Sequence, residues 1–308
     1  MRNLVALVVV VVTCLFAQAQ AIDVTVGGFG QGIFRLDERS TSSFEMKQAY
    51  VSLTGSHFFA WLQVSPGGEK LFSQCGFTTK IKPFNIWKLA VPGSTVVFGK
   101  LKPPSSRHFR VSPIDQATIY SLQGQGKLFP SRDFGLMWTL ENLFDSTMST
   151  MFAIVNGQDA VNSSRGADSN SAKDVYIRTT VKAARHIEFG TSAHYGKGVE
   201  FTNRIVGGDV FVSFPLWTLT LEGFWCDQKD EIMTGYGLFT VEPLKNLTLI
   251  TNIEGIGNRT TRTDVWCTTV GVGYSWPKQK VKLAANFIDR SGDTKEPGTF
   301  ITQLQYVF

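Results

Sequence analysis

The stretch "TFITQLQYVF" (residues 299–308) alternates apolar and polar side chains with a period of two. In an extended chain Phe300, Thr302, Leu304, Tyr306 and Phe308 share one face, and the odd-numbered residues share the other. Terminal residues that nothing fixes tend to fray, so a soluble domain gains little from a bulky ring at its last position. The stretch therefore predicts a strand whose final residue, Phe308, has a role.

The beginning of the sequence predicts export. Arg2 precedes an apolar run over residues 4–15, and small residues follow at Ala17, Ala19 and Ala21, which is the pattern that a signal peptidase reads. The run is too short to serve as a membrane anchor. We expect residues 1–21 to form a cleaved signal peptide and residues 22–308 to form the mature domain.

Composition narrows the classes of protein. The 308 residues are 18% charged and 12% aromatic, with 29 glycines and a formal net charge of +5, an excess too mild to indicate a nucleic-acid partner. Beyond the signal, no window approaches about 18 consecutive apolar residues, which excludes membrane-spanning helices. Cys75, Cys226 and Cys267 form no CxxC pair and no HExxH motif occurs, so no metal site or cofactor is expected. A disulfide between Cys226 and Cys267 remains open.

The remaining chain has one period from end to end. Segments of alternating apolar and polar residues are bounded by turn residues, and long helical patterns are absent. The predicted strands cover residues 22–34, 44–54, 57–64, 70–81, 95–102, 131–141, 147–156, 173–183, 186–196, 204–214, 216–226, 231–241, 245–255, 264–275, 278–289 and 299–308.

The lengths of the connections alternate, and this favours one architecture. Short connections such as "GS" (residues 55–56) and "AR" (184–185) alternate with long polar ones such as "RSGDTKEPG" (290–298), and residues 82–94 are the exception. Short turns at one end and long loops at the other are typical of outer-membrane barrels. The fold class predicted is therefore all-β, a closed antiparallel transmembrane β-barrel of about 16 strands.

Aromatic residues near the strand ends support that prediction, because such rings suit the boundary between lipid and water. They are Trp138, Tyr195, Trp217, Trp225, Trp266, Tyr274, Trp276, Tyr306 and Phe308. With a barrel predicted, Phe308 resembles the carboxy-terminal signal by which bacterial outer-membrane proteins reach their assembly machinery. We expect the outer membrane of a bacterium as the location, with its lipid and that machinery as partners.

Three stretches in order resemble the phosphate-selective porin O and P family. They are "VVFGKLKPPSSR" (residues 96–107), "SRDFGLMW" (131–138), and "FAIVNGQD" followed by "DSNSAKDVYIRTTVK" (152–159 and 168–182). The resemblance implies a sixteen-stranded trimeric pore with a cationic lumen and an inward-folded third external loop, here residues 103–130. This chain is shorter, with several trimmed loops.

Rows of cations indicate anion passage independently of the family. Lys100 and Lys102 alternate with Leu101, Arg178 and Lys182 share a face, and so do Lys280 and Lys282. Because a Lys or Arg on the lipid face costs about 2 to 4 kcal/mol at the midplane, these rows are expected inside or at the rims. The predicted pore-lining, anion-binding residues are Lys100, Lys102, Arg107, Arg110, Arg178, Lys182, Lys280 and Lys282. Two other readings are lipid contact at the headgroups and offset by luminal Glu188, Glu222 and Glu254.

The function predicted is a porin for passive diffusion of small, phosphate-like anions, and not an enzyme. One rival is a phospholipase-like barrel enzyme, for which Ser192 and His194 share a face but show no orienting third group. The other rival is a secreted β-sandwich that binds carbohydrate, because a sandwich alternates in the same way.

Overall fold

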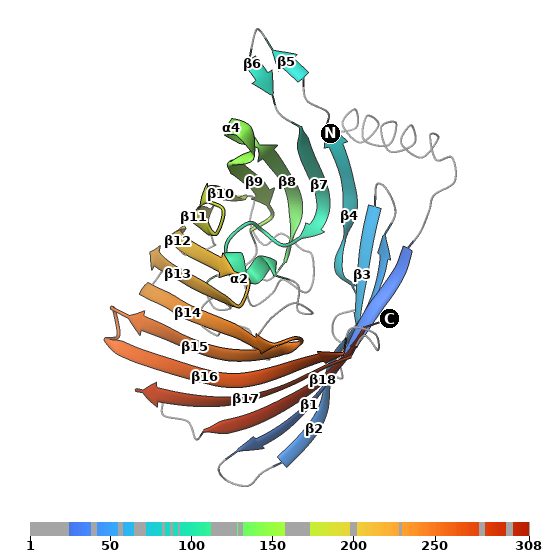
Figure 1. The fold of residues 1–308 in the computed structure, drawn as a ribbon. Helices are drawn as coiled ribbons and strands as arrows, with labels where there is room; N and C mark the ends of the chain where they lie inside the picture. Colours follow the sequence, from blue (N-terminus) through green and yellow to red (C-terminus); the bar gives the residue numbers. More distant parts are fainter. Residues whose placement is uncertain are drawn as a thin grey trace.

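The computed structural model describes residues 25–37, 42–54, 58–64, 72–81, 84–86, 89–91, 93–111, 128, 132–157, 173–197, 202–227, 230–276, 281–293 and 298–307. Within these residues, sixteen strands form one closed antiparallel barrel (Figure 1). They are β1 (Thr25–Asp37), β2 (Ser42–Thr54), β3 (Phe58–Val64), β4 (Phe72–Ile81), β7 (Ser94–Leu101), β8 (Asp133–Asn142), β9 (Met148–Val155), β10 (Asp174–Ala184), β11 (Ile187–Lys197), β12 (Thr202–Phe214), β13 (Trp217–Asp227), β14 (Glu231–Leu244), β15 (Leu247–Asn258), β16 (Thr263–Trp276), β17 (Val281–Gly292) and β18 (Thr299–Val307).

The barrel closes between its first and last strands. β18 pairs with β17 on one side and with β1 on the other, where Phe29 lies opposite Val307. Closure removes both sheet edges and so pairs their backbone groups internally. β1 begins and β18 ends at the edge of the barrel that carries the short connections, since Thr25 pairs with Thr54 just before the connection at residues 55–57. The predicted closed barrel and its strand number are confirmed, and no predicted strand boundary differs from the structure by more than three residues.

The long connection at residues 82–94 contains a small hairpin. Its strands are β5 (Phe84–Ile86) and β6 (Leu89–Val91), which pair with each other in a separate two-stranded sheet (Figure 1). The hairpin explains why this connection is longer than the others at the same end of the barrel.

Helices are few and short in the described part of the chain. The two helices of four residues are α2 (Arg107–Arg110), which follows β7, and α4 (Leu143–Ser146), which connects β8 to β9. No helix among the described residues is long and apolar enough to cross a membrane.

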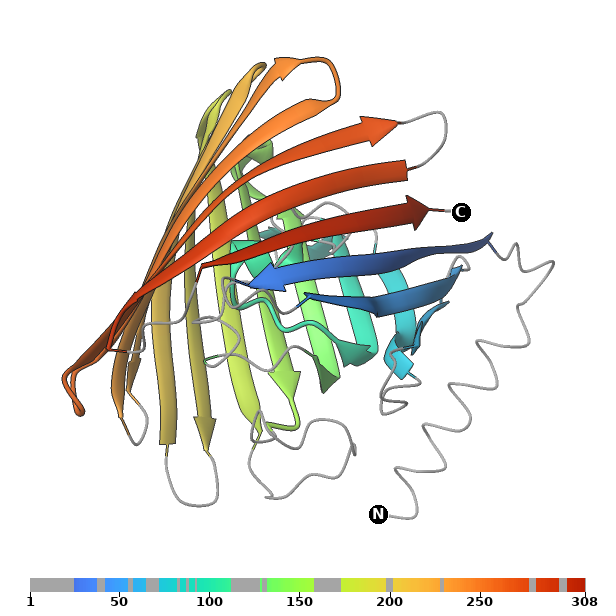
Figure 2. The ribbon, with the colours of Figure 1, turned by 90° about the horizontal axis from the view of Figure 1, so that it is seen from below.

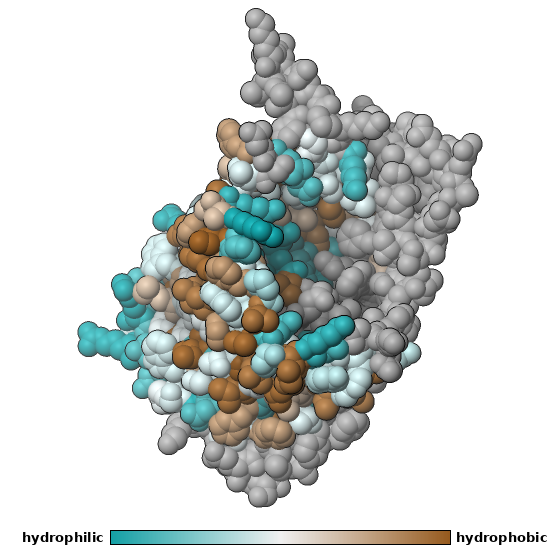
Figure 3. Space-filling view, viewed as in Figure 1, coloured by the Kyte–Doolittle hydropathy of each residue, from teal (hydrophilic) through white to brown (hydrophobic). Residues whose placement is uncertain are grey.

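The outer face of the barrel is apolar. Alternate residues of β8, among them Phe134, Leu136 and Trp138, are exposed, whereas Asp133 and Thr139 on the opposite face are buried. Figure 3 shows apolar side chains gathered over the wall that contains β12–β17. A soluble monomer rarely exposes an apolar surface of this extent. Seven of the nine aromatic residues predicted for the boundary are exposed, namely Trp138, Tyr195, Trp225, Trp266, Tyr274, Trp276 and Tyr306, whereas Trp217 is half-buried.

The inner face carries the polar residues. Strands β10 to β13 direct Arg178, His194, Asp209 and Glu222 inward, and each of these residues is buried. An apolar cluster lies beside them, in which Leu128 packs with inward-facing side chains. The cluster consists of Leu101, Leu128, Ala153, Val155, Tyr176, Ile205, Phe224 and Cys226. Polar inside and apolar outside is the arrangement that a membrane barrel requires.

Three predicted features fall outside the described residues. They are the signal peptide (residues 1–21), Lys280 and the terminal Phe308. They remain predictions.

Candidate pore lining

The connection that leaves β7 enters the barrel. We call residues 102–111 the inner loop segment; it includes α2, which lies inside the ring of strands in both views (Figures 1 and 2). Pro103, Pro104, Ser105 and Ser106 are buried. Proline cannot donate to a ladder, so the pair at 103 and 104 ends β7 and releases the chain from the wall. For its described part, the prediction of an inward-folded loop is confirmed.

Three carboxylates on neighbouring strands hold the inner loop segment. Ser106 Oγ donates to Glu222 Oε2 at 2.8 Å, and the Arg107 backbone N–H donates to Glu222 Oε1 at 2.8 Å. Arg107 Nε donates to Asp209 Oδ1 at 2.8 Å, and its Nη2 donates to Glu188. We call Glu188 (β11), Asp209 (β12) and Glu222 (β13) the wall carboxylates, and their contacts with Ser106 and Arg107 the loop anchor.

A second guanidinium shares the wall carboxylates. Arg178 Nη2 on β10 lies 2.5 Å from Asp209 Oδ2, and Nη1 lies 3.9 Å from Glu222 Oε1. Arg178 must cross β11 to reach β12, and it does so at Gly190. A Cβ at Gly190 would collide with the Asp209 carboxylate and lie 2.6 Å from Arg178 Nη2. Glycine at this position therefore makes the contact between β10 and β12 possible.

Ring contacts fix the inner loop segment against the same wall. The Arg107 guanidinium lies 4.6 Å from the Phe211 ring centre. The His108 ring meets Tyr236 of β14 edge to face, with the ring centres 5.7 Å apart. The segment therefore lies on the wall formed by β11 to β14.

The cations of the inner loop segment crowd one another. Burial lowers the pKa of Lys102 to about 8, with repulsion from Arg132 and Arg110 adding to the effect. The side chain of Arg110 is exposed to the lumen, but the protein around it and repulsion from Arg178 and Arg107 lower its pKa to about 10. Arg107 differs: burial opposes its charge, but its bond to Asp209 and the charge of Glu188 raise its pKa above the usual value. The wall carboxylates therefore compensate Arg107 more fully than Lys102 or Arg110.

Burial also keeps His108 neutral. Its pKa falls to about 4 because of burial and the nearby charge of Lys102. The ring therefore adds no charge at neutral pH.

Several other predicted residues face the lumen. Lys182 lies on β10 on the same face as Arg178 and is exposed. Lys282 of β17 pairs in register with Gln305 of β18, which is buried on the inner face. Lys102 follows the end of β7, where its Nζ lies 3.4 Å from the Val111 carbonyl oxygen.

Lys100 lies on the outer face, which corrects its prediction as a pore-lining residue. It pairs in register with Phe134, and Phe98 two residues earlier is 61% exposed on the same face. The Lys100 Nζ lies 6.0 Å from the Phe134 ring centre. The charge is tolerated because Lys100 is one residue from the end of β7, where a long side chain can extend along apolar surface and keep its ammonium near water.

The acids compensate the cations of the inner loop segment more completely than the sequence predicted. Glu188 and Glu222, with Glu254, were predicted only as a possible offset, and Asp209 was not predicted. Their positions in the alternating pattern were the available signal, because each falls on the polar face of its strand. The pattern could not show which acid pairs with which cation, because the partners are far apart in the sequence. Arg107 and Glu188, for example, are 81 positions apart.

A second polar cluster lies where β8 to β11 meet the long loops. His194 Nε2 and Asp174 Oδ2 are 2.9 Å apart, and the His194 ring stacks on Tyr176 with ring centres 4.1 Å apart. Asp174 fits because Gly157 and Gly196 leave it room: a Cβ on either would collide with its carboxylate. Asp174 is the orienting group that the sequence analysis did not find for His194.

No nucleophile is bonded to His194. Its Nδ1 is buried and has no hydrogen-bond partner among the described residues, so Ser192 is not paired with it. The two cysteines considered for a disulfide, Cys226 and Cys267, are both free.

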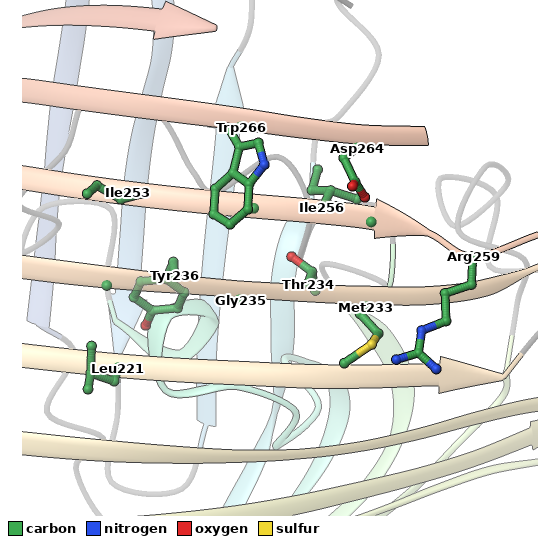
Figure 4. A pocket seen from close by; sticks show the side chains of 13 residues that line it. Leu221, Met233, Thr234, Gly235, Tyr236, Ile253, Ile256, Arg259, Asp264 and Trp266 are labelled. Carbon is green, nitrogen blue, oxygen red and sulfur yellow. The ribbon is translucent and has the colours of Figure 1, made fainter. Parts of the chain in front are cut away.

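The outer face carries a groove of about 580 Å³ near the long-loop end (Figure 4). Gly235 and Gly255 line it, and they belong to a row of outward-facing glycines on neighbouring strands. Gly208, Gly223, Gly235 and Gly255 lie opposite one another in register from β12 to β15, and we call them the glycine row. The Trp266 ring covers the end of the row, where a Cβ at Gly255 would lie 2.8 Å from Trp266 Cζ3.

Comparison with known proteins identifies the fold. No family model and no curated protein matches the sequence. Among solved structures, a loop L8 deletion mutant of OmpT, an outer membrane protein of Vibrio cholerae, aligns with a TM-score of 0.69 and 11% identity, over 94% of this chain and 100% of the other. An anion-selective porin from Comamonas acidovorans aligns at 0.68 with 10% identity, over 94% and 100%. The outer membrane channel DcaP of Acinetobacter baumannii aligns at 0.62 with 11% identity, over 93% and 97%. The chain therefore has the β-barrel fold of outer-membrane porins.

Proposed function

We propose that this chain is a porin that crosses the outer membrane of a bacterium and lets small solutes diffuse through a water-filled lumen. The observation that carries the proposal is the inner loop segment, which enters a closed barrel whose outer face is apolar and whose inner face is polar. Sixteen strands enclose more space than side chains of the wall can fill. A loop folded into that space narrows the passage without closing the wall.

Conductance in planar bilayers tests this function. Purified protein should insert from detergent and produce discrete, ohmic current steps, which neither a soluble sandwich nor an enzyme with a filled barrel would give. Extraction adds a second test, because a membrane barrel needs detergent and keeps its fold until heated, whereas the secreted β-sandwich would stay soluble. Absence of steps from correctly folded, heat-modifiable protein would refute the porin function.

We propose anions as the preferred solutes. Because the wall carboxylates compensate Arg107 and Arg178, the preference rests on Lys102 and Arg110, which they compensate less, and on the exposed Lys182. Cations that line a narrow passage replace part of an anion's lost hydration. The guanidinium of Arg110 can also bind a phosphate in bidentate geometry, which agrees with the resemblance to the phosphate-selective porin O and P family.

Paired charge reversals test the anion preference. Lys182→Glu should shift the reversal potential under a salt gradient towards cations, whereas Lys100→Glu on the outer face should leave it unchanged. Equal shifts for the two variants would contradict the assignment. Block of the chloride current by added phosphate, weakened in Arg110→Met, would test the finer proposal of phosphate-like solutes.

Assembly belongs to the same proposal. A cleaved signal peptide, a terminal Phe308 read by the assembly machinery, and a homotrimer are the expected accompaniments. Deleting Phe308 should reduce the amount of heat-modifiable barrel in the membrane, and crosslinking of membranes should give a trimer band. No enzymatic activity is proposed; lipid hydrolysis that a His194→Ala variant lost would favour the enzyme instead.

A further inference from the structure

The groove on the outer face owes its floor to glycines on two neighbouring strands. Gly235 and Gly237 lie on the outer face of β14, and Gly255 and Gly257 lie on the outer face of β15. Gly235 pairs in register with Gly255, and all four line the groove of about 580 Å³ (Figure 4). The atoms nearest to a Cβ placed on Gly235 belong to the backbone of β13, so no described side chain covers this part of the floor.

Apolar side chains form the walls of the groove. Leu221, Met233 and Ile253 line it and are 42 to 49% exposed. The Trp266 ring lies over Gly255 on the side of β16. The volume is within the range of about 300 to 1,000 Å³ that small-molecule sites occupy. An open apolar groove of this size on the lipid-facing wall fits an acyl chain.

One end of the groove is polar. Arg259, which follows β15, and Asp264, near the start of β16, both line it. Arg259 Nη1 lies 3.3 Å from Glu231 Oε1, which also accepts a hydrogen bond from Trp225 Nε1 at 2.9 Å. An exposed tryptophan ring whose N–H binds a carboxylate suits the boundary between lipid and water. The groove therefore extends from this boundary towards the midplane, in the leaflet next to the long loops, which is the outer one.

The polar end can make the groove specific for one kind of lipid. An acyl chain gains no hydrophobic free energy by leaving the bilayer for the groove, so affinity must come from close packing and from the headgroup. The Arg259 side chain is 63% exposed, and among the described residues only Nη1 of its guanidinium has a partner. Its other N–H groups can donate to a phosphate, and the Asp264 carboxylate can accept from a hydroxyl or an amide N–H. A donor of this strength beside an acceptor suits a phosphorylated sugar.

We propose that the groove binds one phosphorylated glycolipid of the outer leaflet, with an acyl chain along the glycine floor and a phosphate on Arg259. The inference goes beyond the proposed porin function and rests only on the proposed location in the outer membrane. A second copy of the chain fits the groove less well. Its convex wall would meet the raised side chains at the border of the groove rather than the glycine floor.

Native mass spectrometry of the purified full chain in detergent tests the site. When diphosphorylated lipid A is added in increasing amounts, the unaltered protein should retain one copy more tightly than any further copy. Gly235→Leu places a side chain on the floor and should abolish the tight copy. Arg259→Gln should raise its apparent Kd about tenfold, the effect expected when one charged hydrogen-bonding partner is lost. Arg259→Gln also decides the matter if Gly235→Leu does not fold.

Matched controls lie on β12, outside the groove. Gly208→Leu adds the same side chain to another glycine of the glycine row, where a Cβ meets its nearest atom at 3.5 Å. Arg204→Gln removes an arginine whose side chain is 62% exposed and lies 3.9 Å from Asp227. Both controls should bind lipid A as the unaltered protein does. Heat modifiability of each variant checks that the barrel has formed before binding is compared.

The headgroup distinguishes the sources of the phosphate. The unaltered protein should bind lipid A about tenfold more tightly than dephosphorylated lipid A, and Arg259→Gln should bind both equally. Equally tight retention of phosphatidylglycerol would overturn the glycolipid assignment, and lipid binding that Gly235→Leu leaves unaltered would reduce the contact to that of ordinary bilayer lipid. Loss of a crosslinked oligomer in Gly235→Leu with no loss of lipid would assign the groove to a second copy. Because no current is measured, the lipid site and the porin function can fail separately.

Discussion

The two described ends of the inward connection are held by different forces. At its beginning, Arg107 and Ser106 bind the wall carboxylates through directional hydrogen bonds and ion pairs. Near its end, Leu128 is 2% exposed and packs into the apolar cluster with Leu101 and Val155. Charged contacts are strong only while every partner is present, whereas apolar contacts weaken gradually as atoms are removed. The first end therefore depends on each of its charged partners, whereas the second depends on how closely the cluster packs.

The largest effect should come from removing a partner at the charged end. Asp209→Ala removes the carboxylate nearest to the buried Arg178 and leaves Glu222 at 3.9 Å, and loss of a buried partner costs about 3 to 5 kcal/mol. The midpoint of urea unfolding in detergent should fall accordingly. Glu231→Ala, which breaks an exposed pair, is the control and should change stability by less than about 1 kcal/mol. Equal effects would remove the distinction between buried and exposed charges.

The apolar end should respond somewhat less abruptly. Leu128→Ala should lower the unfolding free energy by about 2 to 5 kcal/mol, with the value set by how far the cluster collapses into the space. Leu128→Met conserves volume and should cost less than about 1.5 kcal/mol. Losses of equal size for Leu128→Ala and Leu128→Met would refute an attachment by apolar packing.

A smaller effect should follow from filling the crossing point of Arg178. Gly190→Ala pushes a Cβ into the Asp209 carboxylate and should cost about 1 to 3 kcal/mol by overpacking. Gly208→Ala is the matched control on the next strand, where an added Cβ meets its nearest atom, the Gly190 carbonyl oxygen, at an ordinary 3.5 Å. Loss of stability in the control and not in Gly190→Ala would contradict the proposed crossing.

The smallest effect should be a pH dependence at Lys102. Because its pKa is lowered to about 8, the side chain loses its charge as the pH rises from about 7 to 9, and the anion preference should decline over that range. The folded state binds this proton less tightly than the unfolded chain does, so its stability relative to the unfolded chain should rise as the pH passes from about 8 towards 10.5. In Lys102→Met the selectivity should be flat between pH 7 and 9. A decline of equal size in that variant would assign the titration to another group.

The strands were predictable because burial on one face and lipid on the other impose a period of two on each of them. Alternation in "DVYIRTTVK", for example, places Arg178 and Lys182 inside, as the structure does. The prediction that Lys100 faces the lumen was wrong, because Lys100 shares its face with the apolar Phe98. Near the end of a strand, alternation alone does not show whether the charged or the apolar residue indicates where that face points. The pairing of Lys100 with the exposed Phe134 shows that this face points outward. The sequence of one strand does not reveal which residue of the next strand it pairs with.

The candidate site was less predictable than the fold. Lys102, Arg107 and Arg110 could be recognised as residues of an inward loop because two prolines and a long connection precede β8. Their partners could not be identified, because which acid meets Arg107 depends on where the loop crosses the lumen. The same limit hid Asp174, which meets His194 only because β10 and β11 pair and Gly157 and Gly196 leave space.

The glycine row also bears on the curvature of the barrel. Side chains on the convex face of a sheet spread apart where it bends, but bulky ones such as the Trp266 ring still need room to lie flat against the next strand. Gly208, Gly223, Gly235 and Gly255 carry no side chains, so up to the Trp266 ring the outer face of these strands lacks the atoms that would resist a tight bend. The outline of the lumen is then determined in part by residues that no solute touches, and the shape of the passage becomes sensitive to what the surrounding membrane presses into this groove.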